Sequence, residues 1–396
     1  MTAFWSGHFT TEFDLGGNQY VIAPLLYIQN QLFRANALGN FQDLVKAVTL
    51  DGAMLVYLGG NQNSASAPNE NYARELMELF TCGIGAGYSE ADVQAAAAIL
   101  TGWRVGQFTN DPAPKGIFHT YFDASQHDIT HDWNYHGTDF PTIGASENTE
   151  YLVQQNSVFK LIDALFTWTT DSQTGTNSIA TFICTKLYKF FVYSDPNTSD
   201  STEQTVIAAM ADLFIQSNWE IKPVVSALLK SAHFFDNNNI GCQIKTPAEY
   251  VIGLARQLSL TYAVDGNMTA IGEQFFQPPN VSGWPGYHDW LTTNTYPVRG
   301  TEAISVITAM SDPIAFIKQF PNATYTDATK LSVAIGQLML PRPLSTTRST
   351  TFAQTLAGTT QTYDWPNLLS TSPSTAAANI RNLLNYIIAL PDFELC

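Results

Sequence analysis

Hydrophobic positions along this chain repeat mostly at the spacing of an α-helix. Between residues 20 and 37, Leu25, Ile28, Leu32 and Phe33 fall on one face at three- and four-residue intervals. The same periodicity predicts helices at residues 41–50, 53–58, 70–81, 89–103, 158–167, 178–192, 201–215, 221–231, 248–260, 303–310, 329–340 and 376–390. We therefore predict an all-α fold, formed as a single large domain of about a dozen helices across residues 1–396.

Local signals support several of these helix ends. Asn69 is a suitable N-cap for the helix at 70–81, and Gly83 is suited to end it. Ser89, followed three residues later by Asp92, has the pattern of a capping box. The capping signals and the hydrophobic periodicity therefore predict the same helices.

Three stretches lack this periodicity. Residues 104–148 are rich in Gly, Pro, Asp, His and aromatic residues, and residues 116–122 alternate loosely, as in a short hairpin. Residues 274–299 form a second loop, rich in Pro, Gly and Trp, and residues 344–374 read as a Ser/Thr-rich surface segment. Long irregular segments inside a compact domain are often functional, which directs attention to the first two.

Composition limits the function and the location. The chain has 396 residues with 18 basic and 34 acidic side chains, a net charge of −16, which argues against a nucleic-acid partner. Only 13% of residues are charged, about half the usual ~25%, and such weakly charged surfaces are more common outside cells. No apolar stretch approaches the ~20 residues that span a bilayer. We expect an extracellular or periplasmic protein without a membrane span; the oligomeric state stays open.

The four cysteines show no metal-binding spacing. Cys82, Cys184, Cys242 and Cys396 are far apart in the sequence, and no CxxC pair occurs. They allow three disulfide pairings, and buried free thiols are the simpler interpretation. The cysteines therefore do not define a site.

Several segments together resemble one protein family. They lie at residues 33–41, 68–80, 100–103, 127–128, 277–286 and 391–395, and the run Asn-Glu-Asn-Tyr-Ala-Arg-Glu at 69–75 is the most specific. In this order they are similar to the bacterial "domain of unknown function 1800" family, over nearly the whole chain. The resemblance implies an exported helical protein but no particular reaction, because the activity of the family is unassigned.

The resemblance also shows two departures. Residues 4–9 are similar to an internal family segment, so this chain is expected to begin partway into the family's N-terminal region, with the export signal outside it. Family members usually follow the His-Asp pair with a turn containing Gly and Lys, whereas residues 129–133 here read Ile-Thr-His-Asp-Trp. A role carried by that lysine does not transfer to this chain.

Carboxylates cluster on the predicted helix at 70–81. Glu70 and Arg74 are four residues apart and can form a salt bridge, while Glu75 and Glu78 are three apart and can project together. A carboxylate at an apolar boundary has a raised pKa, as a general acid requires. Paired carboxylates can cleave a glycosidic bond. Alternatively, these acids only complement the dipole of the helix N-terminus.

A second cluster lies in the loop at 104–148. His127, Asp128 and His131 offer imidazole and carboxylate ligands suited to one divalent metal, and His119 and His136 flank them. The same side chains can serve acid–base catalysis without metal, or can be an ordinary solvated surface. The spacing does not choose among these interpretations.

Aromatic segments supply further candidates. In the loop at 274–299, Asn280, Trp284 and Trp290 accompany several prolines, and tryptophan faces suit sugar rings. The alternative is a rigid connection that fills the helical core with its aromatic rings. His8 follows Trp5 in another aromatic segment and is predicted to be a core histidine rather than a ligand.

Three functions remain as hypotheses. The first is a secreted hydrolase of an extracellular polymer such as polysaccharide. Its catalytic residues would be Glu70, Glu75, Glu78, His127 and Asp128, and its substrate-binding residues would be Asn36, Asn69, Arg74, Asn280, Trp284 and Trp290. The second is a metal-dependent enzyme centred on His127, Asp128 and His131. The third is a non-catalytic helical scaffold or binding module of an exported system. We favour the first, since burying so many polar groups for structure alone is costly.

Overall fold

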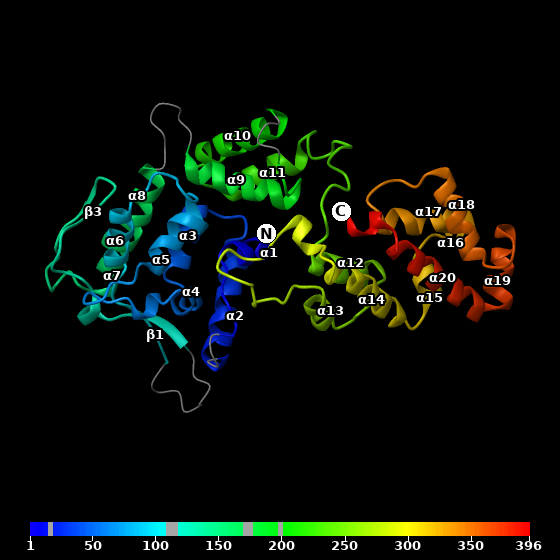
Figure 1. The fold of residues 1–396 in the computed structure, drawn as a ribbon, viewed down its shortest axis with the longest axis horizontal. Coiled ribbons are helices and arrows are strands. Elements are labelled where there is room, and N and C mark those ends of the chain that lie inside the picture. Colours follow the sequence, from blue (N-terminus) through cyan, green and yellow to red (C-terminus); the bar gives the residue numbers. More distant parts are fainter. Residues whose placement is uncertain (15–18, 108–117, 169–176, 197–200) are drawn as a thin grey trace. The chain divides into compact units, whose positions relative to one another are not determined.

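The computed structural model describes residues 1–14, 19–107, 118–168, 177–196 and 201–396, and the described chain is mostly α-helical (Figure 1). The predicted fold class is confirmed, although the described residues form more helices than the dozen expected. Contacts cluster into two compact units. The first contains Met1–Phe191, Pro196–Ser231 and Phe276–Trp284, and the second contains Val192–Asp195, Ala232–Phe275 and Pro285–Cys396.

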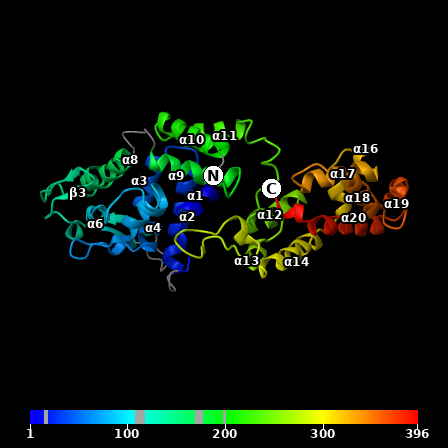
Figure 2. The same ribbon diagram turned by 45° about the horizontal axis from the view of Figure 1, so that its top comes forward.

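The first unit is built around aromatic side chains. Trp5, Phe9, Phe41 and Phe80 are at most 1% exposed, and the ring of Trp5 stacks on those of Phe9 and Phe41. Helices α9 and α10 lie side by side in this unit (Figures 1 and 2). Its helices are α1 (Thr2–His8), α2 (Gln19–Ala35), α3 (Phe41–Thr49), α4 (Gly52–Tyr57), α5 (Glu70–Glu75), α6 (Glu90–Ile99), α7 (Glu150–Val153), α8 (Lys160–Trp168), α9 (Ser178–Phe191), α10 (Ser201–Gln216) and α11 (Ile221–Lys230).

Two small antiparallel sheets occupy the first long irregular stretch. Strand β1 (Trp103–Gln107) pairs with β2 (Phe118–Phe122), and β3 (Trp133–Tyr135) pairs with β4 (Thr138–Phe140). The hairpin signal at residues 116–122 therefore corresponds to a strand over its described part, while residues 108–117 lie outside the described residues. Trp103 of the first sheet and Tyr135 and Phe140 of the second are buried, so both sheets are anchored by aromatic rings.

The second unit has its own hydrophobic core. Buried side chains of α12, α14, α17, α18 and α20 form one cluster, which includes Tyr250, Leu331, Phe352 and Leu383. Helices α17 and α18 pack against each other, as do α18 and α20 (Figure 1). The helices are α12 (Pro247–Gln257), α13 (Asp265–Ala270), α14 (Thr295–Thr308), α15 (Pro313–Ile317), α16 (Asn322–Tyr325), α17 (Ala328–Met339), α18 (Thr346–Ala357), α19 (Trp365–Thr371) and α20 (Pro373–Ile388).

Residues 344–374 are more ordered than their composition indicates. They contain α18 and α19 rather than an irregular surface segment, and Phe352 and Trp365 from this stretch are fully buried. The threonine hydroxyls are satisfied within the helix, since Thr350 and Thr351 donate to the carbonyls of Thr346 and Thr347. Burial of the aromatic rings outweighs the weak helix preference of threonine.

The segment Phe276–Trp284, although distant in the sequence, belongs to the first unit. The backbone N–H of Phe13 donates to the carbonyl of Phe276 at 2.7 Å, and the hydroxyl of Thr10 donates to the carbonyl of Val281. Gly283 has φ +92°, and a Cβ there would lie 2.6 Å from the carbonyl oxygen of Gly7. The segment Phe276–Trp284 therefore packs directly on α1 and the residues that follow it.

Candidate acid–base site

The helix that carries the predicted carboxylates changes its geometry halfway along. Asn69 caps α5 by accepting a hydrogen bond from the N–H of Asn71, as predicted. The helix then continues as a π-helical turn, Leu76–Thr81, in which the hydroxyl of Thr81 donates to the carbonyl of Leu76. Such turns are uncommon and occur frequently at functional sites. The sequence predicts the helix but not its π-helical part.

Arg74 joins three carboxylates at this helix. Its guanidinium lies 3.1 Å from Glu70 Oε2 and 3.8 Å from Glu78 Oε1, and it also pairs with Glu90 from α6. The side chains of Glu70 and Arg74 are about one-third exposed, so these ion pairs contribute little to stability. Their effect is to hold the carboxylates in place along one face of the helix.

Glu75 has an environment that favours the protonated form of its carboxyl. It is half-buried, and burial raises the pKa of its carboxyl, with a further increase from the negative charge of Glu78. Arg74 acts in the opposite direction but does not reverse the shift. Glu75 and Glu78 therefore interact, as their spacing predicts.

The structure places Tyr57 close to Glu75, and Glu12 close to Tyr57. Burial raises the pKa of Tyr57 to about 12, and the nearby negative charges of Glu12 and Glu75 increase it further. The amide of Gln277 donates to Glu12 Oε1 at 3.0 Å, which connects the segment Phe276–Trp284 with this group. Sequence reasoning missed these three residues, although Gln277 opens one family-like segment and Glu12 closely follows another.

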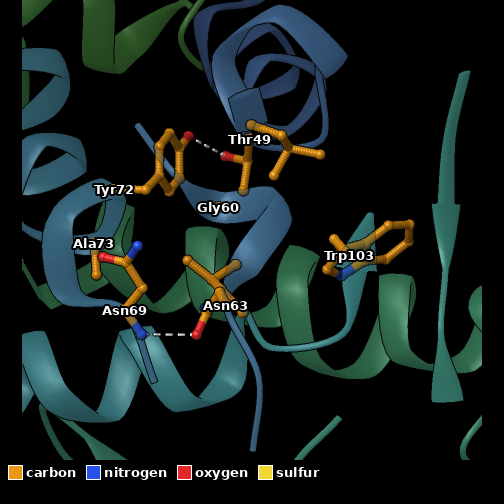
Figure 3. Close-up of a pocket in the computed structure, with 9 residues that line it drawn as sticks. Thr49, Gly60, Asn63, Asn69, Tyr72, Ala73 and Trp103 are labelled. Atoms are coloured by element: carbon orange, nitrogen blue, oxygen red, sulfur yellow. Dashed lines mark hydrogen bonds between the residues drawn. The ribbon is translucent and has the colours of Figure 1, made fainter. Parts of the chain in front are cut away.

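Asn69 lines a small cavity next to this helix (Figure 3). The cavity, of about 10 Å³, is also lined by Asn63, Tyr72 and Trp103, and the N–H of Asn69 donates to Asn63 Oδ1 at 2.8 Å. The buried indole N–H of Trp103 has no hydrogen-bond partner within the described part of the chain. This volume holds about one water molecule, so the cavity in this conformation is not a substrate site.

His127 and Asp128 belong to a separate arrangement around Thr101. His127 is buried; its Nδ1 donates to the carbonyl of Thr101 at 2.9 Å, and burial lowers its pKa. Burial alone would raise the pKa of Asp128, but hydrogen bonds from Trp133 and Thr130 outweigh it and hold the value at about 2. Asp128 is therefore ionised at neutral pH and cannot serve as a general acid there.

The three predicted metal ligands do not all converge. His131 Nδ1 lies 3.0 Å from Asp128 Oδ2, while His127 Nδ1 faces Thr101 instead. Across the part of the chain that the structure covers, no group of three or more His, Cys, Asp or Glu side chains is arranged to hold a metal ion. Elemental analysis of purified protein tests the metal-dependent alternative directly.

The remaining predicted substrate-binding residues come from other parts of the chain. Asn36 donates to the carbonyl of Leu32 at the end of α2, and exposed Asn280 accepts a hydrogen bond from the N–H of Ser282. Trp284 is half-buried in the first unit, whereas Trp290 belongs to the second unit and is 5% exposed. The ring of Trp290 therefore offers little surface to a sugar.

Fold and site together define a mostly α-helical protein with an acidic helix held by one arginine. A family model described as "Protein of unknown function (DUF1800)" matches residues 1–395, so the chain belongs to this family. Comparison with curated proteins and with solved structures found no match. Within the described residues, none of the helices combines the length and apolarity needed to cross a membrane.

Proposed function

We propose that this protein is an extracellular hydrolase that cleaves a polysaccharide, with Glu75 as its general acid. The observation that carries the proposal is the raised pKa of Glu75, which burial and the neighbouring Glu78 produce together. A carboxyl whose protonated form is favoured can donate to a leaving oxygen, and a second carboxylate nearby can act as base or nucleophile. Glu78 and Glu12 are the candidates for this second role, because both lie near Glu75 or its neighbour Tyr57.

Other features of the chain fit this function. Only 13% of its residues are charged, as is common for proteins outside cells. Gln277 and the half-buried Trp284 lie on the segment that packs beside Glu12, where an amide and an aromatic ring can contact a sugar. Arg74 places a positive charge 3.8 Å from Glu78 Oε1, so Glu78 and the half-buried Glu75 lie in different electrostatic surroundings.

The test is turnover of a panel of polysaccharides, measured as release of reducing ends. On an accepted substrate, Glu75→Gln is expected to lower kcat by about 10²–10⁴-fold, the usual contribution of a general acid. Glu90→Gln is the matched control, since Glu90 also interacts with Arg74 but has a pKa lowered by it. Equal activity of wild type and Glu75→Gln would eliminate Glu75 as the acid.

A second candidate is a non-catalytic scaffold, which one observation favours. Asn69, Glu70 and Arg74 already have partners within the protein, and the cavity beside them holds about one water. This function predicts no turnover by wild type on any glycan, together with a loss of stability on Asn69→Ala. Turnover that depends on Glu75 excludes it.

A further inference from the structure

A buried histidine and a lysine meet at the end of the π-helical turn. His8, on α1, is 5% exposed and lies 2.9 Å from the carbonyl oxygen of Phe80 through Nε2. Because a carbonyl only accepts, Nε2 carries the proton, and the lone pair of Nδ1 is free to accept. Lys186 Nζ, from α9, lies 3.1 Å from Nδ1 and 3.2 Å from the carbonyl of Leu79.

Among the described residues, no negative charge is found to act on Lys186. Its nitrogen lies over the ring of Phe182, 4.6 Å from the centroid, and its hydrogen-bond partners are a neutral imidazole and a carbonyl. The titratable groups that face it among the described residues are His8 on α1 and Lys189 on its own helix. Burial first, and the like charge of Lys189 second, lower the pKa of Lys186 to about 8.

We propose that Lys186 and His8 form a reactive amine site that takes a small carbonyl electrophile, an aldehyde, at the ε-amino group of Lys186. The nitrogen lone pair attacks the carbonyl carbon, and an N–C bond forms. The carbonyl oxygen leaves as water with the two protons that the nitrogen gives up. His8 Nδ1 is positioned to take the first proton and pass it to this oxygen. This site is independent of the hydrolase proposal.

The test labels the folded wild-type protein with formaldehyde and cyanoborohydride at low conversion, which traps each imine as a methylated amine. Mass spectrometry of peptides gives the rate at each lysine, and exposed Lys189 on the same helix is the internal comparator. At pH 7 an amine of pKa about 8 is roughly 10% free base, against less than about 0.1% for an ordinary lysine. Lower basicity offsets part of this gain, so we expect Lys186 to react about tenfold faster than Lys189.

The pH profile gives a second readout. The rate at Lys186 should level off above about pH 8 and should not follow the profile of Lys189. Slower labelling of Lys186 than of Lys189, or parallel profiles for the two, would overturn the proposal. A preference that persists in urea would also overturn it, because the site requires the fold.

A variant isolates the histidine. His8→Phe preserves the stacking on Phe4 but removes both ring nitrogens, and is expected to reduce the preference, while the lowered pKa that burial and Lys189 give Lys186 remains. An unchanged preference in folded His8→Phe would refute the role of His8. Should this variant fail to fold, the wild-type rates and pH profile still decide the proposal.

Discussion

At the scale of single residues, Asp51 shows how burial makes stability depend on pH. The hydroxyl of Thr11 donates to Gln29 at 2.6 Å, and the amide of Gln29 donates to Asp51 Oδ1 at 2.7 Å. Asp51 also caps α4 by accepting from the N–H of Met54. These hydrogen bonds favour the carboxylate, but burial outweighs them and raises the pKa of Asp51 to about 6.

The raised pKa determines the sign of the pH effect. The folded state binds this proton more tightly than the unfolded state, where the pKa is about 3.9. The stability from Asp51 is therefore complete below pH 4 and is lost as pH rises through about 6. Asn cannot ionise, so Asp51→Asn should gain about 2 kcal/mol relative to wild type between pH 4 and pH 7. Urea unfolding across this range measures the difference.

A matched variant separates this effect from general acid titration. Asp327 is also an N-cap, of α17, but hydrogen bonds from the N–H groups of Lys330 and Thr329, with the charge of Lys330, lower its pKa. Asp327→Asn should therefore lose stability relative to wild type as pH rises, opposite in sign to Asp51→Asn. A pH-independent difference for Asp51→Asn would contradict the assignment.

At the scale of elements, local rules predict the helices well. Asn69 caps α5, and Ser89 with Asp92 forms a capping box at α6, both as the sequence indicates. Helix α1 was not predicted, because its seven residues are too few to show a clear helical period. Helices α18 and α19 were not predicted, because threonine has a weak helix preference and obscures the hydrophobic periodicity there. The burial of Phe352 and Trp365, which stabilises these helices, depends on tertiary packing and cannot be seen in the local sequence.

The candidate site is less predictable than the helices. The i, i+3 spacing brings Glu75 and Glu78 together on one helix, which is a local property. The meeting of Glu12 with Gln277 joins positions 265 residues apart, and no periodicity carries that information. Tyr57 lies near Glu75 because of how α4 packs, so the sequence pattern could not predict its place in the site either.

Docking of the segment Phe276–Trp284 on α1 depends on one glycine. Gly283 has φ +92°, and a Cβ there would lie 2.6 Å from the Gly7 carbonyl oxygen. Gly283→Ala should therefore strain the backbone and displace the segment, lowering the free energy of unfolding of the first unit by about 1–3 kcal/mol. Thermal unfolding measures the loss, and hydrogen exchange of Val281 reports the displacement.

Gly286 provides the control for this substitution. A Cβ at Gly286 meets no atom within 4 Å, and its φ is −121°. Gly286→Ala should therefore leave stability within about 0.5 kcal/mol of wild type. If Gly283→Ala and Gly286→Ala had the same stability, the close approach of Gly283 to Gly7 would not be needed for docking of the segment.

At the scale of the whole molecule, the two units have separate cores, and a buried ion cluster belongs to the second. Arg299 is 0% exposed, donates to the carbonyl of Lys245 at 3.2 Å and pairs with Glu394 at 3.3 Å. Lys245 in turn donates to the carbonyl of Phe393 at 2.7 Å. Burial raises the pKa of Glu394, so its carboxylate depends on the cations beside it.

Removing this arginine should therefore weaken the second unit selectively. Arg299→Met leaves Glu394 buried without its ion pair, which costs about 3–5 kcal/mol, whereas Arg348→Met breaks a partly exposed pair with Asp392 that is worth at most about 1 kcal/mol. Hydrogen exchange should accelerate in α20 of Arg299→Met and remain unchanged in α9, because separate cores allow each unit to open by itself. Equal acceleration in both helices would mean that the chain unfolds as one cooperative body.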